Sequence, residues 1–538
     1  MSRSPRYALA LLAGAVLGLG SPPIDTYLAL WLGLVAFAWI LETPATTTKW
    51  PRVSQVMRGA MRGWAFGVGA NLILLRFITT VVVRFTSLPG VAAAVALVLL
   101  SFFEGLRWMV AGVACQTLAR ARVPRPVALA AGVYGGTFVP TMLPWTTAGL
   151  VSPWPAMIQL ADVVGERGVA ALMALAAGLT ASGLRAALSP STRRRGLLEV
   201  GGAVAVVLLQ AAYGDARMRS VELARSRAPR VRVGLLQPSI GATARWDETR
   251  GPTILQDLTT LTRREEAHGA DLVVWPETAY PYRIPHGARQ ALEGDRALVQ
   301  PGIHGPIIAG VQTRGPTEHL FYNSVVVATA DGALSEPYDK RHLLWFGETV
   351  PLGDRIPWLR SVFARGLGMA AGDREVPLVA GAVRAAAMVC YEDMLPESGR
   401  EAMSVSPNLL VNVTNDAWFS GTSEPDLHLR VAVPRAVELR RDLVRAVNAG
   451  PATWVDAAGR VRMRAPMISP STISAVPSLL DGTTLYARFG DAPWAVLGLV
   501  LANVAVWRTA WTKRRTPLSV RREGPPSGLS PAGPDVRA

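Results

Sequence analysis

The chain has 538 residues, of which 50% are hydrophobic and 17% are charged, and its mean hydropathy is +0.26. Soluble domains carry about 25% charged residues, so this composition excludes a disordered chain and an ordinary cytosolic enzyme. The formal net charge of +16 fits either nucleic-acid binding or basic loops that hold membrane helices on the cytoplasmic side. The only cysteines are Cys115 and Cys390, which excludes a disulfide framework and a CxxC metal site.

Long apolar runs fill residues 1–213 and recur once near the C-terminus. A helix that crosses a bilayer needs about 20 apolar residues, and the sequence predicts eight such spans. They lie near 7–20, 23–41, 64–86, 89–115, 127–145, 160–183, 196–213 and 491–509. The first also fits a cleaved signal peptide, but a second span follows at once, which favours a retained helix. We therefore expect a seven-helix membrane domain over 1–213 and a C-terminal membrane helix over 491–509.

Lysine and arginine occupy alternate loops between these spans. They cluster at 3–6, 49–62, 120–125, 185–195 and 508–522, whereas 21–25, 86–90 and 146–156 contain neither. The positive-inside rule then places both termini in the cytoplasm. With seven crossings before residue 229 and one after 480, the region between lies on the far side, which in a bacterium is the periplasm. Nucleic-acid binding is disfavoured because the basic residues separate helices and form no groove-sized patch.

Four charged residues fall inside the predicted spans: Arg76, Arg84, Glu104 and Arg107. A charge in lipid is costly, so these side chains should face the interior of the helix bundle or reach an interface. Glu104 and Arg107 stand three residues apart on one helix and could pair with each other. A headgroup or proton site and a structural ion pair are both open interpretations.

Residues 229–480 change to the pattern of an α/β domain. Short β-branched runs bounded by Gly, Pro, Asn or Asp predict strands, at 230–237, 271–275, 306–311, 323–329, 385–390 and 409–414. Helical patterns cover 253–266 and 426–439, and Asp331-Gly332 predicts a hairpin within 323–340. This alternation favours a layered α/β domain. The segment 214–229 and the tail 516–538 are predicted to be a spacer and a disordered cytoplasmic end.

Three reactive residue types follow predicted strands in this domain. Cys390 ends an apolar strand, Glu277 follows 271–275, and Lys340 follows the hairpin; α/β domains place reactive groups at strand ends. A thiol without a partner in its own domain is unusual in an oxidising compartment, so Cys390 is either a nucleophile or a buried structural cysteine. A nucleophilic cysteine needs a base. Either a carboxylate or a histidine could be this base, since all six histidines lie in this domain.

Four segments in this order carry a family resemblance. They are WPET around Glu277, YDKRHLLWFGETVPLGDR over 338–355, VCYED around Cys390 and VNVTNDAWF over 411–419. Together they resemble the nitrilase or carbon–nitrogen hydrolase superfamily, which implies an αββα sandwich with a Glu–Lys–Cys triad. Because this domain lies between several N-terminal helices and one C-terminal helix, the whole chain is similar to the membrane-integral apolipoprotein N-acyltransferase family.

The resemblance implies a role for each matching residue. Glu277 is expected to be the general base, Lys340 the oxyanion stabiliser and Cys390 the nucleophile. The supporting positions are Glu348, Tyr391, Glu392 and Trp246, the last an aromatic residue associated with the acyl pocket. One departure is Trp345, where the family more often has proline, and it bears on the shape of this loop.

The implied reaction takes an acyl chain from a phospholipid, through a thioester on Cys390, to the α-amine of the N-terminal diacylglyceryl-cysteine of an apolipoprotein. The implied location is the bacterial inner membrane. The resemblance implies no cofactor and no metal, and the sequence contains no HExxH, P-loop or GxGxxG in a strand–turn–helix context. Apolar segments such as 358–369 and Trp418-Phe419 are expected either to border the active-site mouth or to pack in the core.

Two other functions are open. In a membrane-tethered nitrilase or amidase, water would take the place of the accepting amine, although a small soluble substrate does not require a bundle of membrane helices. In a transporter or channel with an accessory periplasmic domain, the charges within the spans would be essential and Cys390 would not.

Overall fold

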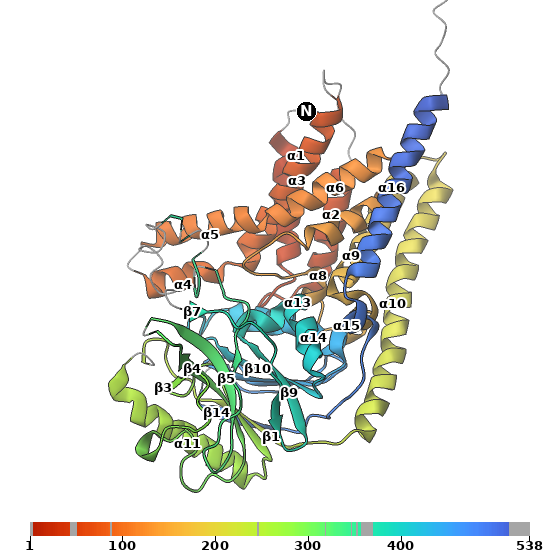
Figure 1. The fold of residues 1–538 in the computed structure, drawn as a ribbon. Coiled ribbons are helices and arrows are strands. Elements are labelled where there is room, and N and C mark those ends of the chain that lie inside the picture. The colour runs from red at the N-terminus through yellow and green to blue at the C-terminus, as the bar shows by residue number, and fades with distance from the viewer. Residues whose placement is uncertain are drawn as a thin grey trace, which may run out of the picture.

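The structure is a computed structural model that describes residues 4–42, 51–86, 89–244, 247–317, 319–345, 347–350, 353, 355–356, 369–467 and 469–515. It has two parts (Figure 1): long helices from the N-terminal half of the chain, and a domain of strands and helices from the second half. We call them the helical part and the α/β domain. The final helix α16 (Ala492–Arg515) leaves the α/β domain and runs back to the level of the helical part.

Ten helices form the helical part in the described residues. They are α1 (Ser4–Gly18), α2 (Tyr27–Leu41), α3 (Pro51–Leu74), α4 (Phe77–Phe85), α5 (Gly90–Glu104), α6 (Leu106–Arg120), α7 (Arg125–Gly136), α8 (Thr147–Leu150), α9 (Ala161–Ala187) and α10 (Arg193–Arg227). Helices α1 and α3 approach so closely that a methyl group added to Gly14 would overlap the carbonyl oxygen of Phe66. Such backbone contact over small residues is typical of helix pairs in membranes.

Three helical stretches are long and apolar enough to cross a membrane: Gly90–Arg120, Ala161–Ala187 and Arg193–Arg227. A fourth candidate combines α3 and α4, which bend by 59° where they meet. Helices α1 and α2 are apolar but shorter. Among the described residues, three or four of the eight predicted spans therefore correspond to helices with the length and composition that a span requires. The span predicted at 127–145 is wrong in length, because α7 ends at Gly136 after 12 residues.

Glu104 and Arg107 lie beside the break between α5 and α6, and both bond to the irregular segment that follows α7. Glu104 Oε1 accepts the N–H groups of Met142 at 2.7 Å and Leu143 at 3.3 Å. Arg107 donates to the carbonyl oxygen of Trp145. A backbone without regular hydrogen bonds needs such partners when it is buried, so these contacts favour a structural role for both side chains.

Arg76 and Arg84 also bond to backbone oxygens. Arg76 lies at the bend between α3 and α4 and donates to the carbonyl of Ile73 at 2.7 Å. Arg84 donates to the carbonyl of Ser420, in the α/β domain, at 2.5 Å. The second contact ties α4 to a loop of the other part of the chain.

Two sheets form the α/β domain. The first contains β1 (Val233–Gln237), β2 (Leu272–Trp275), β3 (Arg283–Pro285), β4 (Ile307–Arg314), β5 (Phe321–Ala328), β6 (Tyr338–Asp339), β7 (Met369–Ala370) and β14 (Ser471–Ala475), in the order β14-β1-β2-β4-β5-β6 with β3 paired to β4 and β7 to β5. The second contains β8 (Leu378–Ala380), β9 (Val383–Val389), β10 (Leu409–Asn415), β11 (Leu443–Asn448), β12 (Thr453–Val455) and β13 (Val461–Arg464), in the order β13-β12-β11-β10-β9-β8.

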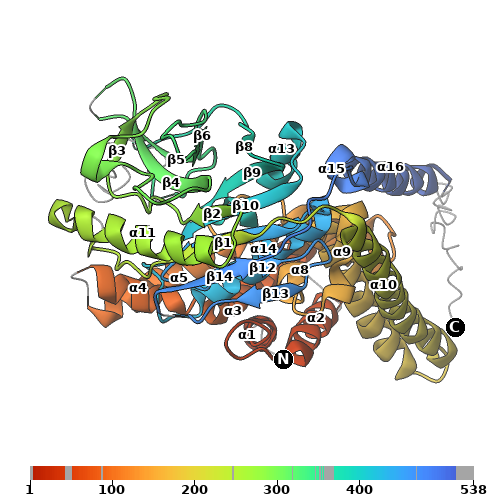
Figure 2. The same ribbon diagram turned by 90° about the horizontal axis from the view of Figure 1, so that it is seen from below.

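The sheets pack face to face, with helices on both outer faces. Strand β10 shows the alternation of a strand buried on both sides: Val411 faces the core between the sheets, whereas Leu410 faces the helices. Helix α11 (Gly251–Ala267) lies along β1 and β14 on the outer face of the first sheet (Figure 2). Helix α14 (Glu424–Leu439) covers the second sheet and contacts α8 and α9, and α13 (Pro396–Ala402) and α15 (Leu485–Phe489) lie beside it. The layered α/β domain expected from the sequence is confirmed.

The predicted elements of this domain correspond to observed ones. The six predicted strands are β1, β2, β4, β5, β9 and β10, and the two predicted helices are α11 and α14. The hairpin is also present, since β5 and β6 pair antiparallel with Ser324 opposite Asp339.

The segment 214–229 differs from the predicted spacer, because α10 continues through it to Arg227. The end of this helix is tied to the α/β domain by Arg225, which donates to both carboxylate oxygens of Asp442 at 3.0 and 2.9 Å. The predicted tail 516–538 lies outside the described residues.

Candidate active site

Cys390 lies at the carboxyl end of β9 and begins the 3-10 turn Cys390–Met394. Strand β9 pairs with β8 on one side and β10 on the other, and Asn412 of β10 donates its side-chain amide to the carbonyl of Cys390 at 3.0 Å. The backbone φ of Cys390 is +54°, a conformation that residues other than glycine seldom adopt. Strain of this kind is typical of functional positions that their surroundings hold in place.

Glu277 follows β2 by two residues and is 8% exposed. Its Oε1 accepts the side-chain amide of Asn323 at 2.6 Å, and its Oε2 accepts the backbone N–H of Asn415 at 2.9 Å. Asn323 belongs to β5 of the same sheet, whereas Asn415 ends β10 of the opposite sheet. The carboxylate of Glu277 therefore lies at the junction of the two sheets.

Lys340 follows β6 and is 1% exposed. Its Nζ is 2.8 Å from the carboxylate of Glu348 and 3.9 Å from Oε1 of Glu277, and it lies 5.5 Å from the centre of the Tyr391 ring. The N–H of Leu344 donates to Glu348 Oε2 at 2.9 Å and orients that carboxylate. The ammonium group is thus held between two glutamates.

Burial and charge set the protonation states in this site. Burial raises the pKa of the Cys390 thiol well above its ordinary value, and Glu277 raises it further, whereas Lys340 lowers it. Burial also raises the pKa of Glu277, against the attraction of Lys340. Burial alone would lower the pKa of Lys340, but the neighbouring negative charges, Glu348 first among them, raise it. The site therefore places a protonated thiol near a carboxylate and a permanent cation, which is what proton transfer from thiol to carboxylate requires.

The histidine alternative for the base finds no support in the described contacts. The largest charge effects on the pKa of Cys390 come from Glu277, Lys340, Glu348 and Asp416. Three histidines of this domain have carboxylate partners other than Glu277: His342 with Glu401 at 2.9 Å, His286 with Asp339 at 2.7 Å, and His428 with Asp393 at 2.8 Å.

Glu392 joins the nucleophile turn to the lysine segment. Its side chain is fully buried. One carboxylate oxygen accepts the N–H groups of Arg341 at 2.8 Å and His342 at 3.0 Å, and the other accepts the N–H of Val389 at 2.7 Å and the hydroxyl of Tyr338 at 3.0 Å. Four donors on one buried carboxylate hold the segments of Cys390 and Lys340 at a fixed separation.

The remaining predicted supporting residues are Tyr391 and Trp246. The hydroxyl of Tyr391 donates to the carbonyl of Leu343 at 3.1 Å, so this residue also contacts the lysine segment. Trp246 lies outside the described residues.

Asn323 and Asn415 contact Glu277 but were not singled out from the sequence. Asparagine is depleted in strand interiors because it packs poorly there. Asn323 lies within β5, two residues before the apolar run 325–328, and this is the signal that could have identified that position.

Three aromatic contacts join loops near this site to α4 and α5. They are Trp418 with Phe85 at 4.7 Å between ring centroids, Phe419 with Phe77 at 5.8 Å, and Trp345 with Phe103 at 6.4 Å. A cavity of about 450 Å³ opens between the two parts of the chain, with Met142 on one side and Leu343, Trp345 and Tyr391 on the other. Loops of the α/β domain near the site therefore face α4 and α5 (Figure 1). Residues 357–368, in the other apolar segment predicted to border the mouth, lie outside the described residues.

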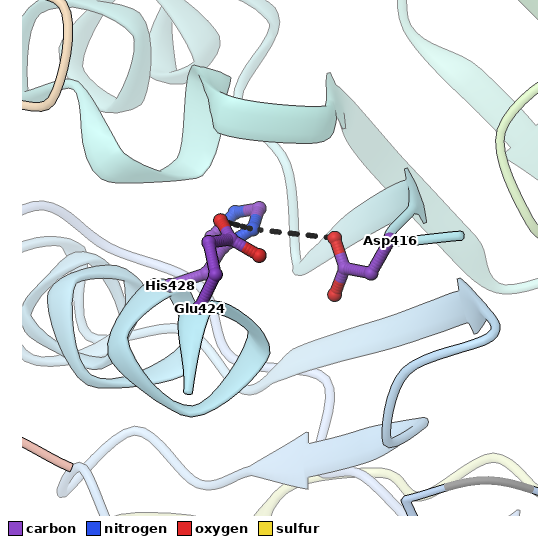
Figure 3. A group of neighbouring side chains, drawn as sticks. All are labelled: Asp416, Glu424 and His428. Atoms are coloured by element: carbon purple, nitrogen blue, oxygen red, sulfur yellow. Dashed lines mark ion pairs between the residues drawn. The ribbon is translucent and has the colours of Figure 1, made fainter. Parts of the chain in front are cut away.

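One group of three among the described side chains could bring metal-ligating atoms together: Asp416, Glu424 and His428, whose ligand atoms lie within 4.8 Å of one another (Figure 3). His428 Nδ1 is 3.7 Å from Asp416 and 3.8 Å from Glu424. Arg445 Nε donates at 2.9 Å to Asp393, the hydrogen-bonding partner of His428. Because this buried guanidinium supplies positive charge to the cluster, charge balance does not require a metal ion.

Comparisons with known proteins cover both parts of the chain. Residues 232–475 match the carbon–nitrogen hydrolase family, and residues 13–179 match the apolipoprotein N-acyltransferase N-terminal domain. An apolipoprotein N-acyltransferase of Geobacter metallireducens is 29% identical over 519 residues, covering 93% of this chain and 95% of that protein. The apolipoprotein N-acyltransferase of Brucella melitensis is 30% identical over 85% of this chain and 86% of its own length. The one of Azotobacter vinelandii is 30% identical over 94% and 95%.

Proposed function

The chain belongs to the apolipoprotein N-acyltransferase family and is an acyltransferase of lipoprotein maturation, and we propose that Cys390, Glu277 and Lys340 carry out the transfer. The observation that carries this assignment is the position of Lys340 Nζ, 2.8 Å from Glu348 and 3.9 Å from Glu277, in a buried site at the strand ends that also carry Cys390. The donor is a phospholipid and the acceptor is an apolipoprotein with a diacylglyceryl-modified N-terminal cysteine.

In the first half-reaction Glu277 takes the proton of the Cys390 thiol, and the thiolate attacks the carbonyl carbon of a phospholipid acyl ester. The negative charge that develops on the carbonyl oxygen is stabilised by Lys340, a type of contribution worth about 10²–10³ in rate per donor. The C–O bond of the ester then breaks, and Glu277 returns the proton to the departing oxygen. The products are a lysophospholipid and a thioester on Cys390.

In the second half-reaction the α-amine of the lipoprotein attacks the thioester carbonyl and gives a proton to Glu277. The C–S bond breaks, an amide forms, and Glu277 returns the proton to the sulfur of Cys390. The enzyme is thereby restored, and a ping-pong scheme follows. Exclusion of water from the site protects the thioester from hydrolysis between the two steps.

The membrane arrangement that we propose has eight spans, with both termini in the cytoplasm and the α/β domain in the periplasm, at the bacterial inner membrane. It is supported by the alternation of basic and uncharged loops, and by helices that lie in the predicted segments, of which α7 fills only part of 127–145. In this arrangement residues 1–213 and 491–509 are the membrane domains, 229–480 is the catalytic domain, and 516–538 is a cytoplasmic tail. The aromatic contacts of Trp418, Phe419 and Trp345 with α4 and α5 support a mouth that opens towards lipid.

Reporter fusions test this arrangement. A fluorescent protein that matures only in the cytoplasm should fluoresce when fused after residue 538, and alkaline phosphatase inserted in the 286–300 loop should be active. The opposite pattern at either position would contradict the proposed topology.

Mass spectrometry of the purified protein after exposure to phospholipid tests the chemistry. The Cys390 peptide should gain the mass of one acyl chain, lysophospholipid should appear, and both should be lost in Cys390→Ser. Cys115→Ser is the matched control, because Cys115 is the only other thiol and lies buried in α6. If no thioester forms on Cys390 while an acyl group still reaches an apolipoprotein, the proposed mechanism is wrong.

A further inference from the structure

A fully buried cluster of charges lies beside the proposed catalytic site. His428, on α14, sits between two carboxylates: its Nε2 is 2.8 Å from Asp393 Oδ1, and its Nδ1 is 3.7 Å from Asp416 Oδ1 (Figure 3 shows His428 with Asp416). His428 is 2% exposed, Asp416 is 1% exposed and Asp393 is fully buried. The catalytic steps described above use none of the three.

Each carboxylate belongs to a segment that carries the chemistry. Asp393 is the third residue after Cys390, in the same 3-10 turn. Asp416 follows Asn415, whose backbone N–H donates to Glu277. The histidine therefore lies between the turn that holds the nucleophile and the strand end that orients the base.

The two carboxylates also determine which form of His428 fits. A neutral imidazole has a single N–H and can donate to one carboxylate, whereas an imidazolium has two N–H groups and can face both. Burial alone would lower the pKa of His428, but the charge of Asp393 and its hydrogen bond raise it to about 10, against the repulsion of Arg445. The third carboxyl of the cluster, Glu424, lies 3.8 Å from Nδ1 and has its pKa raised to about 8 by burial and by Asp416. A neutral Glu424 leaves two carboxylates balanced by His428 and Arg445.

The nucleophile turn is thus held from two sides. Glu392 ties it to the segment of Lys340, and Asp393 ties it to α14 through His428 and to β11 through Arg445. The positive φ of Cys390 makes such support necessary, because a strained backbone persists only where its surroundings hold it.

We propose that His428, as an imidazolium between Asp393 and Asp416, is a positioning residue. It fixes the position of the nucleophile turn relative to the strand end that orients Glu277. This inference rests on the proposed function for the roles of Cys390 and Glu277. It assigns His428 no contact with substrate.

The test compares His428→Gln with His304→Gln in the full-length protein. Gln keeps a polar side chain of similar size but removes the charge, and because its N–H groups share one nitrogen and its oxygen only accepts, it cannot donate from two separate nitrogens to the two carboxylates. His304 is the matched control, since it also lies near a carboxylate, 3.7 Å from Glu266, but is 86% exposed on the surface. Two rates are measured: alkylation of Cys390 by iodoacetamide, followed by peptide mass spectrometry, and acylation of Cys390 by phospholipid.

His428→Gln should slow both rates by about tenfold or more, since small displacements of reacting groups have effects of that size or larger. The KM for phospholipid should change less than kcat, and His304→Gln should match the wild type. Asp393→Asn should give the same defect, and the double variant should be no slower than either single variant, because the two residues act as one unit. If His428→Gln does not fold, Asp393→Asn decides the question.

Wild-type alkylation and acylation rates in a folded His428→Gln or Asp393→Asn protein would overturn the proposal. A stoichiometric metal ion retained by the purified protein would also overturn it, because the metal would occupy the Nδ1 that the imidazolium uses. Alkylation requires no lipid. A wild-type protein that transfers no acyl group would therefore refute the proposed function, while the alkylation rates would still decide the role of His428.

Discussion

The ammonium group of Lys340 lies 2.8 Å from the carboxylate of Glu348, in a site where the lysine is 1% exposed. A buried lysine without such a partner would lose its proton, because burial disfavours the charged form. The negative charge of Glu348 is the largest of those that keep the pKa of Lys340 above its ordinary value. The lysine can stabilise an oxyanion only while it is charged, so Glu348 acts through Lys340.

We expect Glu348→Gln to lower the rate of Cys390 acylation by about 10²-fold, the scale of losing one charge-stabilising donor. Removing one partner of a buried ion pair also costs about 3–5 kcal/mol, so the melting temperature should fall. The matched control is Glu336→Gln, which breaks the exposed pair with Arg374 and should leave both measurements unchanged. Equal rates in the two variants would contradict this role of Glu348.

The pH dependence of acylation should report the environment of Glu277. The hydrogen bond from Asn323 favours the charged form of Glu277, and only the charged form can take the thiol proton. Asn323→Leu removes that bond, so the pKa of Glu277 rises and the acid limb of the rate profile moves to higher pH, by about one unit. Asn323→Asp adds a negative charge and should move the limb in the same direction. A shift to lower pH in either variant would contradict Glu277 as the base.

Substitutions around Glu392 should destabilise the protein in a graded way. Tyr338→Phe removes one of the four donors to this carboxylate, at a cost of about 1.5–3 kcal/mol for a bond to a charged group. Glu392→Gln should cost more, because an amide –NH₂ cannot accept from the N–H groups that face it. Chemical unfolding in detergent measures both losses of stability. A smaller loss in Glu392→Gln than in Tyr338→Phe would be inconsistent with a Glu392 carboxylate that holds the two segments through four donors.

Two substitutions separate the role of Glu104 as a hydrogen-bond acceptor from the role of its charge. Glu104→Gln retains an acceptor oxygen for the N–H groups of Met142 and Leu143, so stability and acyl transfer should be close to those of the wild type. Glu104→Leu leaves both N–H groups without this acceptor, at about 1–3 kcal/mol each, and should lower the melting temperature. If both variants lose activity equally, the charge itself matters and the structural interpretation is wrong.

Much of the fold followed from local patterns. The strands β1, β2, β4, β5, β9 and β10 and the helices α11 and α14 were predicted because a two-residue or 3.6-residue period is a property of neighbouring residues. Three features of the helical part were not predicted from these patterns. They are the break between α5 and α6, the early end of α7 and the extension of α10 to Arg227. Each depends on contacts with distant segments, such as those of Glu104 with Met142 and of Arg225 with Asp442, which hydropathy does not contain.

The sequence by itself determined the residue types of the candidate site and their positions at the ends of strands, since reactive side chains that follow apolar runs are visible locally. Only the tertiary structure decided which groups surround them. Asn323 and Asn415 reach Glu277 across 46 and 138 residues, and His428 reaches Asp393 across 35. These contacts depend on how the two sheets and α14 pack against one another, a relationship between surfaces far apart in the chain.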